Sequence, residues 1–355
     1  MPAHTEAGVL LLDMAEQLAD QVTERQYSLQ PDLIQRFGPA GRERTKQDTV
    51  FSLKYLAESL MMDSPSLFVH YITWLKALLE GYKVGVKEIE VNLACLREEV
   101  CLSIGGEHQE HVTRFLDIGL HQLALPADVP PFIAADAPYG AEAAVYLRIL
   151  LEGRRQEASR LIMELVEART PLADIYLHIF QPVQYEIGRL WQTGGINVAQ
   201  EHYCTAATQL IMSQLYPYLF GSERKDRRLV ATCVGDEIHE VGLRMVADLF
   251  EAEGWDTYYL GANVPTRSII QTVISQQAHM VAISATMTYH VHLVKKLIEQ
   301  IRASEGCRGV KIIVGGLPFN IDPQLWIQVG ADGCSRNAGE AVRMAAGLLR
   351  EIPAS

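Results

Sequence analysis

The sequence lacks features that are typical of several common protein classes, and each missing feature excludes one class. Six cysteines occur among 355 residues, with no C-x-x-C pair and no zinc-finger spacing, so neither a disulfide framework nor a structural zinc site is expected. No apolar run reaches the roughly 18 residues that span a bilayer, and no signal segment is recognisable. We therefore expect a cytoplasmic protein that does not associate with membranes.

Basic residues are also scarce. The chain has 31 Lys and Arg against 43 Asp and Glu, a net charge of -12. The longest basic cluster, Glu223 to Arg228, is interrupted by acids. Nucleic-acid binding depends on clustered cations that neutralise phosphates, so direct binding to nucleic acid is not expected.

Helical periodicity dominates the first part of the chain. Residues 1–128 are predicted to form an all-helical domain, because apolar residues recur every three or four positions. Ser64 followed by Pro65 predicts a helix start, and Gly81 predicts its end. The apolar faces are expected to contain Val50, Leu53, Leu56, Leu60, Leu67, Tyr71, Trp74 and Leu78.

The remaining chain is predicted to form a linker and two further domains. The proline-rich residues 129–140 cannot form an interior helix and are expected to be the linker. Residues 141–221 contain four helical segments, broken near Gly153, Pro171 and Gly194, which predict a four-helix bundle. Residues 222–355 alternate short β-branched runs with helices, which is typical of a doubly wound, five-stranded parallel sheet.

The carboxyl ends of the predicted strands hold three short motifs. A parallel sheet binds its ligand at this edge, yet neither a G-x-G-x-x-G dinucleotide motif nor a P-loop occurs. Instead Glu237-x-His239-x-x-Gly242 follows the first strand, Ser284-x-Thr286 the third, and Gly315-Gly316 the fourth. These motifs resemble D-x-H-x-x-G, S-x-T and G-G of the cobalamin-binding domain family, which has a flavodoxin-like fold. The resemblance covers about residue 228 to the C-terminus.

This resemblance implies a role for each motif. His239 would be the lower ligand of the cobalt and would displace the dimethylbenzimidazole base of the cofactor. Glu237 can accept the other ring proton of His239, which fixes the tautomer and strengthens the nitrogen donor. Ser284 could bond the displaced base, and Gly315-Gly316 would let the nucleotide tail lie against the backbone. The chain has Glu237 where the family usually has Asp.

The predicted bundle carries the pattern W-x9-E-H, formed by Trp191, Glu201 and His202. This pattern resembles the cap of CarH-type adenosylcobalamin photoreceptors, over residues 141–220. The resemblance implies that Trp191 packs against the adenosyl group, Glu201 bonds its ribose and His202 lines the same pocket. Two features depart from that family: Gln192 replaces a histidine that ligates cobalt after photolysis, and no DNA-binding helix-turn-helix domain precedes the cap.

The first domain resembles, less specifically, the globin-like helical domain of photocobilins, photoreceptors that add a bilin to the cobalamin. Under this interpretation biliverdin would bind in an apolar pocket near His70, Tyr71 and Trp74, with Cys95 or Cys101 as thioether sites. The alternative is that these aromatic residues are ordinary core and that the domain serves dimerisation or partner docking.

Together these features predict a light sensor rather than an enzyme. Photolysis of adenosylcobalamin would change the quaternary structure of a homo-oligomer, or its contacts with an output protein that the sequence does not identify. Two alternatives stay open: a corrinoid carrier of a methyltransferase system, and a light-independent regulator that senses cobalamin. Preferential binding of methylcobalamin would favour the carrier, and equal oligomer sizes in darkness and light would favour the regulator.

Overall fold

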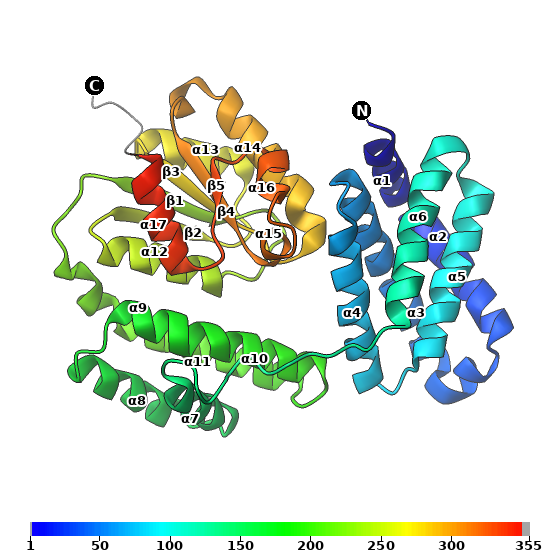
Figure 1. Cartoon of the computed structure of the whole chain (residues 1–355), viewed down its shortest axis with the longest axis horizontal. Helices are drawn as coiled ribbons and strands as arrows, with labels where there is room; N and C mark the ends of the chain where they lie inside the picture. The colour runs from blue at the N-terminus through cyan, green and yellow to red at the C-terminus, as the bar shows by residue number, and fades with distance from the viewer. Residues whose placement is uncertain (1, 350–355) are drawn as a thin grey trace. The chain divides into compact units, whose positions relative to one another are not determined.

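The computed structural model describes residues 2–349. The chain divides after Asp128 into two compact units, each with its own core (Figure 1). We describe each unit by itself.

The first unit is built from helices. Helix α4 begins at Pro65 after Ser64 and ends at Gly81, as the sequence predicts. Helix α3 is kinked at Gly38, which has a φ of 67° and is followed by Pro39. The helices are α1 (Ala3–Asp13), α2 (Ala15–Leu29), α3 (Asp32–Met61), α4 (Pro65–Gly81), α5 (Val86–Ser103) and α6 (Gly106–Leu123).

The second unit begins with a helical bundle whose breaks fall where the sequence predicts them. Its elements are α7 (Gly140–Leu151), α8 (Arg155–Glu167), α9 (Leu172–Ile175), the π-helical turn η1 (Tyr176–Phe180), α10 (Gln181–Gln192) and α11 (Val198–Gln214). Elements α9, η1 and α10 follow one another without a break. The π-helical turn was not predicted, and such turns often lie at functional positions.

A five-stranded parallel sheet completes the second unit, with strand order β2-β1-β3-β4-β5. The predicted doubly wound fold is confirmed: α12 and α17 cover one face, and α13, α14 and α16 lie on the other (Figure 1). The strands are β1 (Arg228–Cys233), β2 (Asp256–Gly261), β3 (Met280–Ser284), β4 (Lys311–Gly315) and β5 (Gly333–Cys334). The helices between and after them are α12 (Val241–Ala252), α13 (Thr266–Ser275), α14 (Val291–Ala303), α15 (Leu317–Ile321), α16 (Leu325–Val329) and α17 (Ala338–Leu348).

The bundle and the sheet share a hydrophobic core, although the sequence predicts them as separate domains. Met245 and Leu249 of α12 and Ala338 of α17 belong to the same buried cluster as Phe180 and Ile211 of the bundle. The hydroxyl of Tyr176 in η1 also donates to Asp248 of α12 at 2.8 Å. Burial of this shared apolar surface stabilises the contact of the bundle with the helices beside the sheet.

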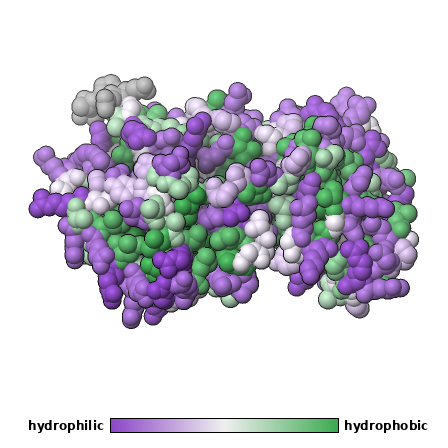
Figure 2. All heavy atoms as spheres, turned by 60° about the horizontal axis from the view of Figure 1, so that its bottom comes forward, coloured by the Kyte–Doolittle hydropathy of each residue, from purple (hydrophilic) through white to green (hydrophobic). Residues whose placement is uncertain are grey.

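Part of the bundle surface stays apolar. Val145, Val198 and Leu210 are exposed. Figure 2, which turns the lower side of Figure 1 toward the viewer, shows apolar patches on this side of the molecule. Among the described residues, no helix is both long and apolar enough to cross a membrane.

Candidate cobalamin site

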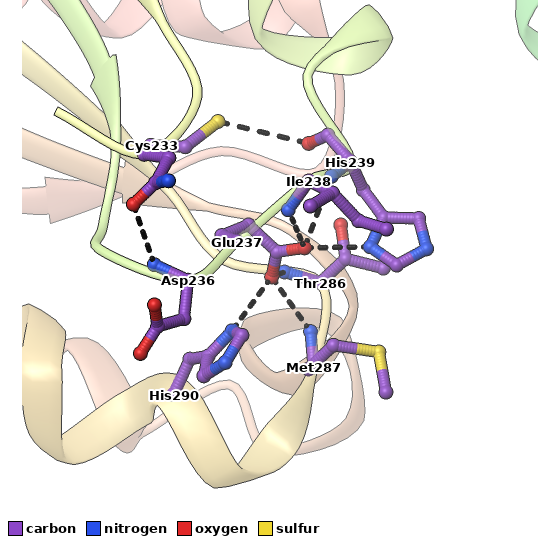
Figure 3. Close-up of polar contacts among 9 residues, drawn as sticks. Cys233, Asp236, Glu237, Ile238, His239, Thr286, Met287 and His290 are labelled. Carbon is purple, nitrogen blue, oxygen red and sulfur yellow. Dashed lines mark hydrogen bonds and ion pairs between the residues drawn. The ribbon is translucent and has the colours of Figure 1, made fainter.

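The loop between β1 and α12 is organised around the buried carboxylate of Glu237 (Figure 3). Oxygen Oε1 accepts hydrogen bonds from the backbone amides of Ile238 and His239, both at 3.1 Å. The same oxygen lies 2.6 Å from Nδ1 of His239. One carboxylate therefore fixes both the backbone and the ring of His239.

The other oxygen of Glu237 holds the segment that follows β3. Oxygen Oε2 accepts from the amides of Thr286 at 2.7 Å and Met287 at 3.0 Å. It also lies 3.2 Å from Nδ1 of His290, a buried residue of the short helix η3 (Thr288–His290). Glu237 thus joins the first and third strand ends through six nitrogen contacts.

These contacts determine the charge of Glu237. Burial by itself would raise the pKa of this carboxyl group, but the hydrogen bonds from His239, His290 and the Met287 amide outweigh it and hold the pKa well below the usual range. Glu237 is consequently an anion, which favours a proton on Nδ1 of His239. Nitrogen Nε2 is then the one with a free electron pair.

The ring of His239 is half-exposed, whereas Glu237 is fully buried. In Figure 3 the ring nitrogen opposite Nδ1 points away from Glu237. The protein therefore presents one oriented imidazole nitrogen at the ligand-binding edge of the sheet. A neutral imidazole with a carboxylate on its second nitrogen is a typical ligand for a transition metal.

The sheet register brings the other predicted motifs beside this loop. Cys233 pairs with Ser284 on β3, and Ser284 pairs with Gly315 on β4, so the three strand ends lie side by side. Gly316 has a φ of 107°, and a Cβ there would lie 1.9 Å from the carbonyl oxygen of Ala285. Only glycine fits at this position.

Gly235 in the first loop and Gly242 in the helix that follows it differ from Gly316. A Cβ on Gly235 or Gly242 would meet no atom within 4 Å, and Gly242 is exposed in the first turn of α12. The surface next to His239 is therefore open. The contact of Thr286 with this loop is made by its backbone amide, which donates a hydrogen bond to Glu237.

The predicted cap residues lie on two consecutive helices of the bundle. Half-buried Trp191 is near the end of α10, and Glu201 is in the first turn of α11. The side chain of Asn197 accepts from the Gln200 amide at 3.0 Å and starts α11. Glu201 contacts the ring of exposed His202 and accepts from the Thr205 hydroxyl at 2.9 Å. Gln192, which replaces the expected histidine, is buried.

Helix α11 connects this cap to the His239 loop. The side-chain amide of Gln209 donates to Oε1 of Glu240 at 3.2 Å, and Glu240 directly follows His239. Oxygen Oε2 of Glu240 accepts from the amide of Ala262 after β2 at 3.1 Å. Glu201 lies eight residues before Gln209, which is about 12 Å along the helix at 1.5 Å per residue.

In the first unit, the three residues proposed for a bilin are placed on α4. Tyr71 is buried, stacks on Tyr55 at a centroid distance of 4.0 Å and bonds the Ser52 hydroxyl at 2.8 Å. Burial raises the pKa of Tyr71 and lowers that of His70. Trp74 is half-buried, with its ring 6.3 Å from that of Tyr71. Tyr71 therefore belongs to the core, while Trp74 lies at its margin.

The two candidate thioether cysteines differ in accessibility. Cys95 is buried, and burial raises the pKa of its thiol. Cys101 is half-buried near the end of α5. A reactive thiol needs both access and ionisation, so Cys101 is the more accessible of the two.

A groove of about 570 Å³ lies at the opposite edge of the sheet. Its lining includes Arg227 and Trp255, which precede β1 and β2, together with Arg343 of α17. This is the amino-terminal edge, so the groove is separate from the His239 loop.

An oriented imidazole at the carboxyl edge of a parallel sheet, joined to a helical cap, defines a cobalamin-binding module. Two models described as B12 binding domains match the chain, one over residues 143–216 and the other over residues 227–346. The chain belongs to the B12-binding corrinoid proteins, and it binds a cofactor of this class.

Curated relatives include several dimethylamine corrinoid proteins. Dimethylamine corrinoid protein 3 from Methanosarcina acetivorans is 34% identical over 131 residues, which is 36% of this chain and 60% of the relative. Dimethylamine corrinoid protein 3 from Methanosarcina mazei is 32% identical over 123 residues, 34% of this chain and 71% of the relative. The chain thus spans 60% of the length of the first of these relatives.

The solved structure of the Methanosarcina barkeri monomethylamine corrinoid protein resembles this fold. It is 21% identical and has a TM-score of 0.52, over 57% of this chain and 96% of that one. At this identity the resemblance concerns the fold alone.

The site residues fit the cofactor. Anionic Glu237 leaves Nε2 of His239 available for cobalt, and Gly235 and Gly242 leave space beside it. Sequence reasoning missed His290 and Glu240. Glu240 could have been suspected because it adjoins His239. His290 belongs to no motif, so the sequence did not indicate that it lies at the site.

Proposed function

We propose that this protein is a light-responsive sensor that binds adenosylcobalamin between its bundle and its sheet, with His239 as the lower cobalt ligand. The main support is the placement of Glu201. Its carboxylate is partly exposed and positioned by Thr205, on a helix that also bonds the neighbour of His239 through Gln209. A carboxylate can accept from the ribose hydroxyls of an adenosyl group, whereas a methyl group offers no hydrogen bond.

Bound adenosylcobalamin supplies a cobalt–carbon bond that light breaks. The chain contributes Trp191 as an apolar wall and Glu201 as a hydrogen-bond acceptor for the upper group. Without an upper group, Trp191 and Glu201 would lack these contacts, and the preferred position of the cap would change. Exposed Val145, Val198 and Leu210 provide apolar bundle surface through which this change could alter oligomer assembly.

The test combines illumination with a measurement of size. The full chain is loaded in darkness with adenosylcobalamin or with methylcobalamin, and absorption and molar mass are recorded before and after green light. We expect light to change both quantities in the adenosyl form, and Glu201→Gln to weaken the dark-state binding of that form. Bound adenosylcobalamin that does not respond to light would overturn the proposal. A spectral change without a change of mass would place the output in partner contacts instead.

We further propose that the first unit binds biliverdin against Trp74 and His70. Trp74 supports this because it lies at the margin of the aromatic core, where the flat face of a tetrapyrrole can be contacted from one side. Titration with biliverdin should produce a red-absorbing band that Trp74→Ala weakens and Phe132→Ala, in the second unit, does not. If no band forms, the first unit serves dimerisation or docking. Loss of a covalent adduct only in Cys101→Ser would identify the attachment site.

A corrinoid methyl carrier is the second candidate, favoured by the relatives that are named dimethylamine corrinoid proteins. In that case methylcobalamin should bind at least as tightly as adenosylcobalamin, and a methyltransferase should exchange the methyl group with the bound corrinoid. If the adenosyl form binds but its oligomers have the same size in darkness and light, with no partner released, the protein is a light-independent cobalamin sensor.

A further inference from the structure

We propose that Thr205 and Gln184 are positioning residues that hold Glu201, and that Gly188 leaves room for the upper ligand, so that together they set the preference for adenosylcobalamin over methylcobalamin. This inference rests on the proposed function and identifies further residues that determine ligand specificity.

A chain of hydrogen bonds runs through the bundle to Glu201. The Thr205 hydroxyl has one proton, which it shares between Oε1 of Glu201 at 2.9 Å and Oε1 of Gln184 at 3.1 Å. The amide nitrogen of Gln184 donates to the Thr208 hydroxyl at 2.9 Å. Thr208 in turn bonds the Tyr146 hydroxyl at 3.1 Å, and both of these residues are fully buried. Three helices, α7, α10 and α11, thus contribute to the position of one carboxylate.

The buried end of this chain makes it rigid. Tyr146 and Thr208 lie in the shared core, so moving either hydroxyl would leave a buried polar group without its partner. Gln184 is held through Thr208, and Thr205 lies between Gln184 and Glu201. The Glu201 carboxylate therefore has a protein donor that orients it before a ligand binds. Preorganised acceptors bind a complementary donor more tightly than mobile ones.

Gly188 supplies the room beside this acceptor. Gln184, Gly188 and Trp191 are spaced i, i+4 and i+7, so they share one face of α10. Gly188 is exposed, and a Cβ at this position would meet no atom within 4 Å. A glycine inside a helix is destabilising relative to alanine, and no protein packing requires it here. The open surface at Gly188 leaves room on this face for a bulky upper ligand, whereas a methyl group would not need it.

The experiment measures dissociation constants of the full chain for adenosylcobalamin and methylcobalamin in darkness. Thr205→Val keeps the shape of the side chain and removes the hydroxyl. We expect it to weaken adenosylcobalamin binding by about tenfold, with a much smaller effect on methylcobalamin. Thr205→Ser, which keeps the hydroxyl, should have the wild-type ratio of the two dissociation constants. Thr193→Val is the matched control, because this exposed hydroxyl bonds only backbone carbonyls at the end of α10.

Two further variants test the same inference at other positions, so that the result does not depend on whether Thr205→Val folds correctly. Gln184→Met should shift the ratio in the same direction as Thr205→Val, and Gly188→Leu should weaken adenosylcobalamin binding more than methylcobalamin binding. Equal changes for both ligands, or an unchanged ratio in all three variants, would overturn the inference. Glu201→Gln distinguishes a failure of this inference from a failure of the proposed function. If Glu201→Gln also leaves the relative affinity for adenosylcobalamin over methylcobalamin unchanged, the proposed adenosyl cap is wrong. If Glu201→Gln alone lowers this relative affinity, only the positioning role of Thr205, Gln184 and Gly188 is wrong.

Discussion

Gln209 of the bundle donates a hydrogen bond to Glu240, the residue that follows His239, over a distance of 3.2 Å. Because the other oxygen of Glu240 accepts from the Ala262 amide, this one side chain connects the cap, the His239 loop and the end of β2. A movement at His239 can therefore reach the cap through a single intervening residue.

Replacing Glu240 tests this connection. Glu240→Ala would leave the Ala262 amide and the Tyr259 hydroxyl without their acceptor. Because these groups are only partly buried and water can reach them, we expect it to lower the free energy of unfolding by about 1–2 kcal/mol in urea titrations. Glu240→Gln should cost less, since its amide oxygen still accepts and the amide of Gln209 can rotate to match it. Equal urea midpoints for Glu240→Ala and the wild type would show that the contact contributes nothing.

Glu237 should not tolerate its amide counterpart. Its two oxygens accept four backbone amides and two ring nitrogens, so the NH2 group of Glu237→Gln would face donors. We expect this variant to lose about 3 kcal/mol or more of stability, nearly as much as Glu237→Ala. Glu237→Asp keeps the charge and should lose less. Thermal unfolding of the apo protein provides the comparison, and a wild-type midpoint for Glu237→Gln would contradict the donor assignment.

Asp248 should make stability depend on pH. Burial raises the pKa of this carboxyl group from 3.8 to about 6, while the Tyr176 hydroxyl and Arg244 lower it and Glu251 adds to the rise. The folded state therefore binds the proton more tightly than the unfolded state. This stabilisation is complete below pH 3.8 and is lost as the pH rises through about 6.

The control for Asp248 is its neutral counterpart. Asp248→Asn still accepts from Tyr176 but does not ionise. We expect it to be more stable than the wild type at pH 7.5, by about 2–3 kcal/mol at most, with the difference vanishing near pH 4. Urea midpoints measured across this range decide the matter. A difference that does not vary with pH would exclude titration of Asp248 as its cause.

Two glycine substitutions should separate folding from cofactor binding. Gly316→Ala places a Cβ against the Ala285 carbonyl oxygen at a positive φ, so we expect a loss of about 3 kcal/mol or more in the apo protein. Gly242→Ala meets no atom and should leave stability unchanged or raise it by up to about 1 kcal/mol. Its cobalamin affinity should nevertheless fall, because the added methyl group enters the space beside His239. Unaltered affinity in Gly242→Ala would place the corrin elsewhere.

Local sequence patterns were sufficient for the fold of the second unit. Helix breaks at Gly153, Pro171 and Gly194 and the alternation of strands with helices are properties of neighbouring residues. Since the carboxyl ends of parallel strands share one edge, this pattern also brings Ser284 and Gly315 beside the His239 loop.

Contacts between distant segments could not be predicted in this way. His290 reaches Glu237 across 53 residues, and Tyr176 reaches Asp248 across 72. Both depend on packing that no local periodicity encodes. The π-helical turn at Tyr176 was also missed, because a single turn of five residues is too short to reveal a change of helical period in the sequence.

The most direct test asks which nitrogen binds the cobalt. The full chain is labelled with ¹⁵N-histidine and loaded with reduced, paramagnetic cobalamin of natural isotope content, and its electron paramagnetic resonance spectrum is recorded. If His239 is the lower ligand, each cobalt line should split into a doublet, and this pattern should disappear in His239→Ala. Triplets from the ¹⁴N of the cofactor's own dimethylbenzimidazole, in the labelled wild-type protein, would contradict the site that Glu237 and His239 define.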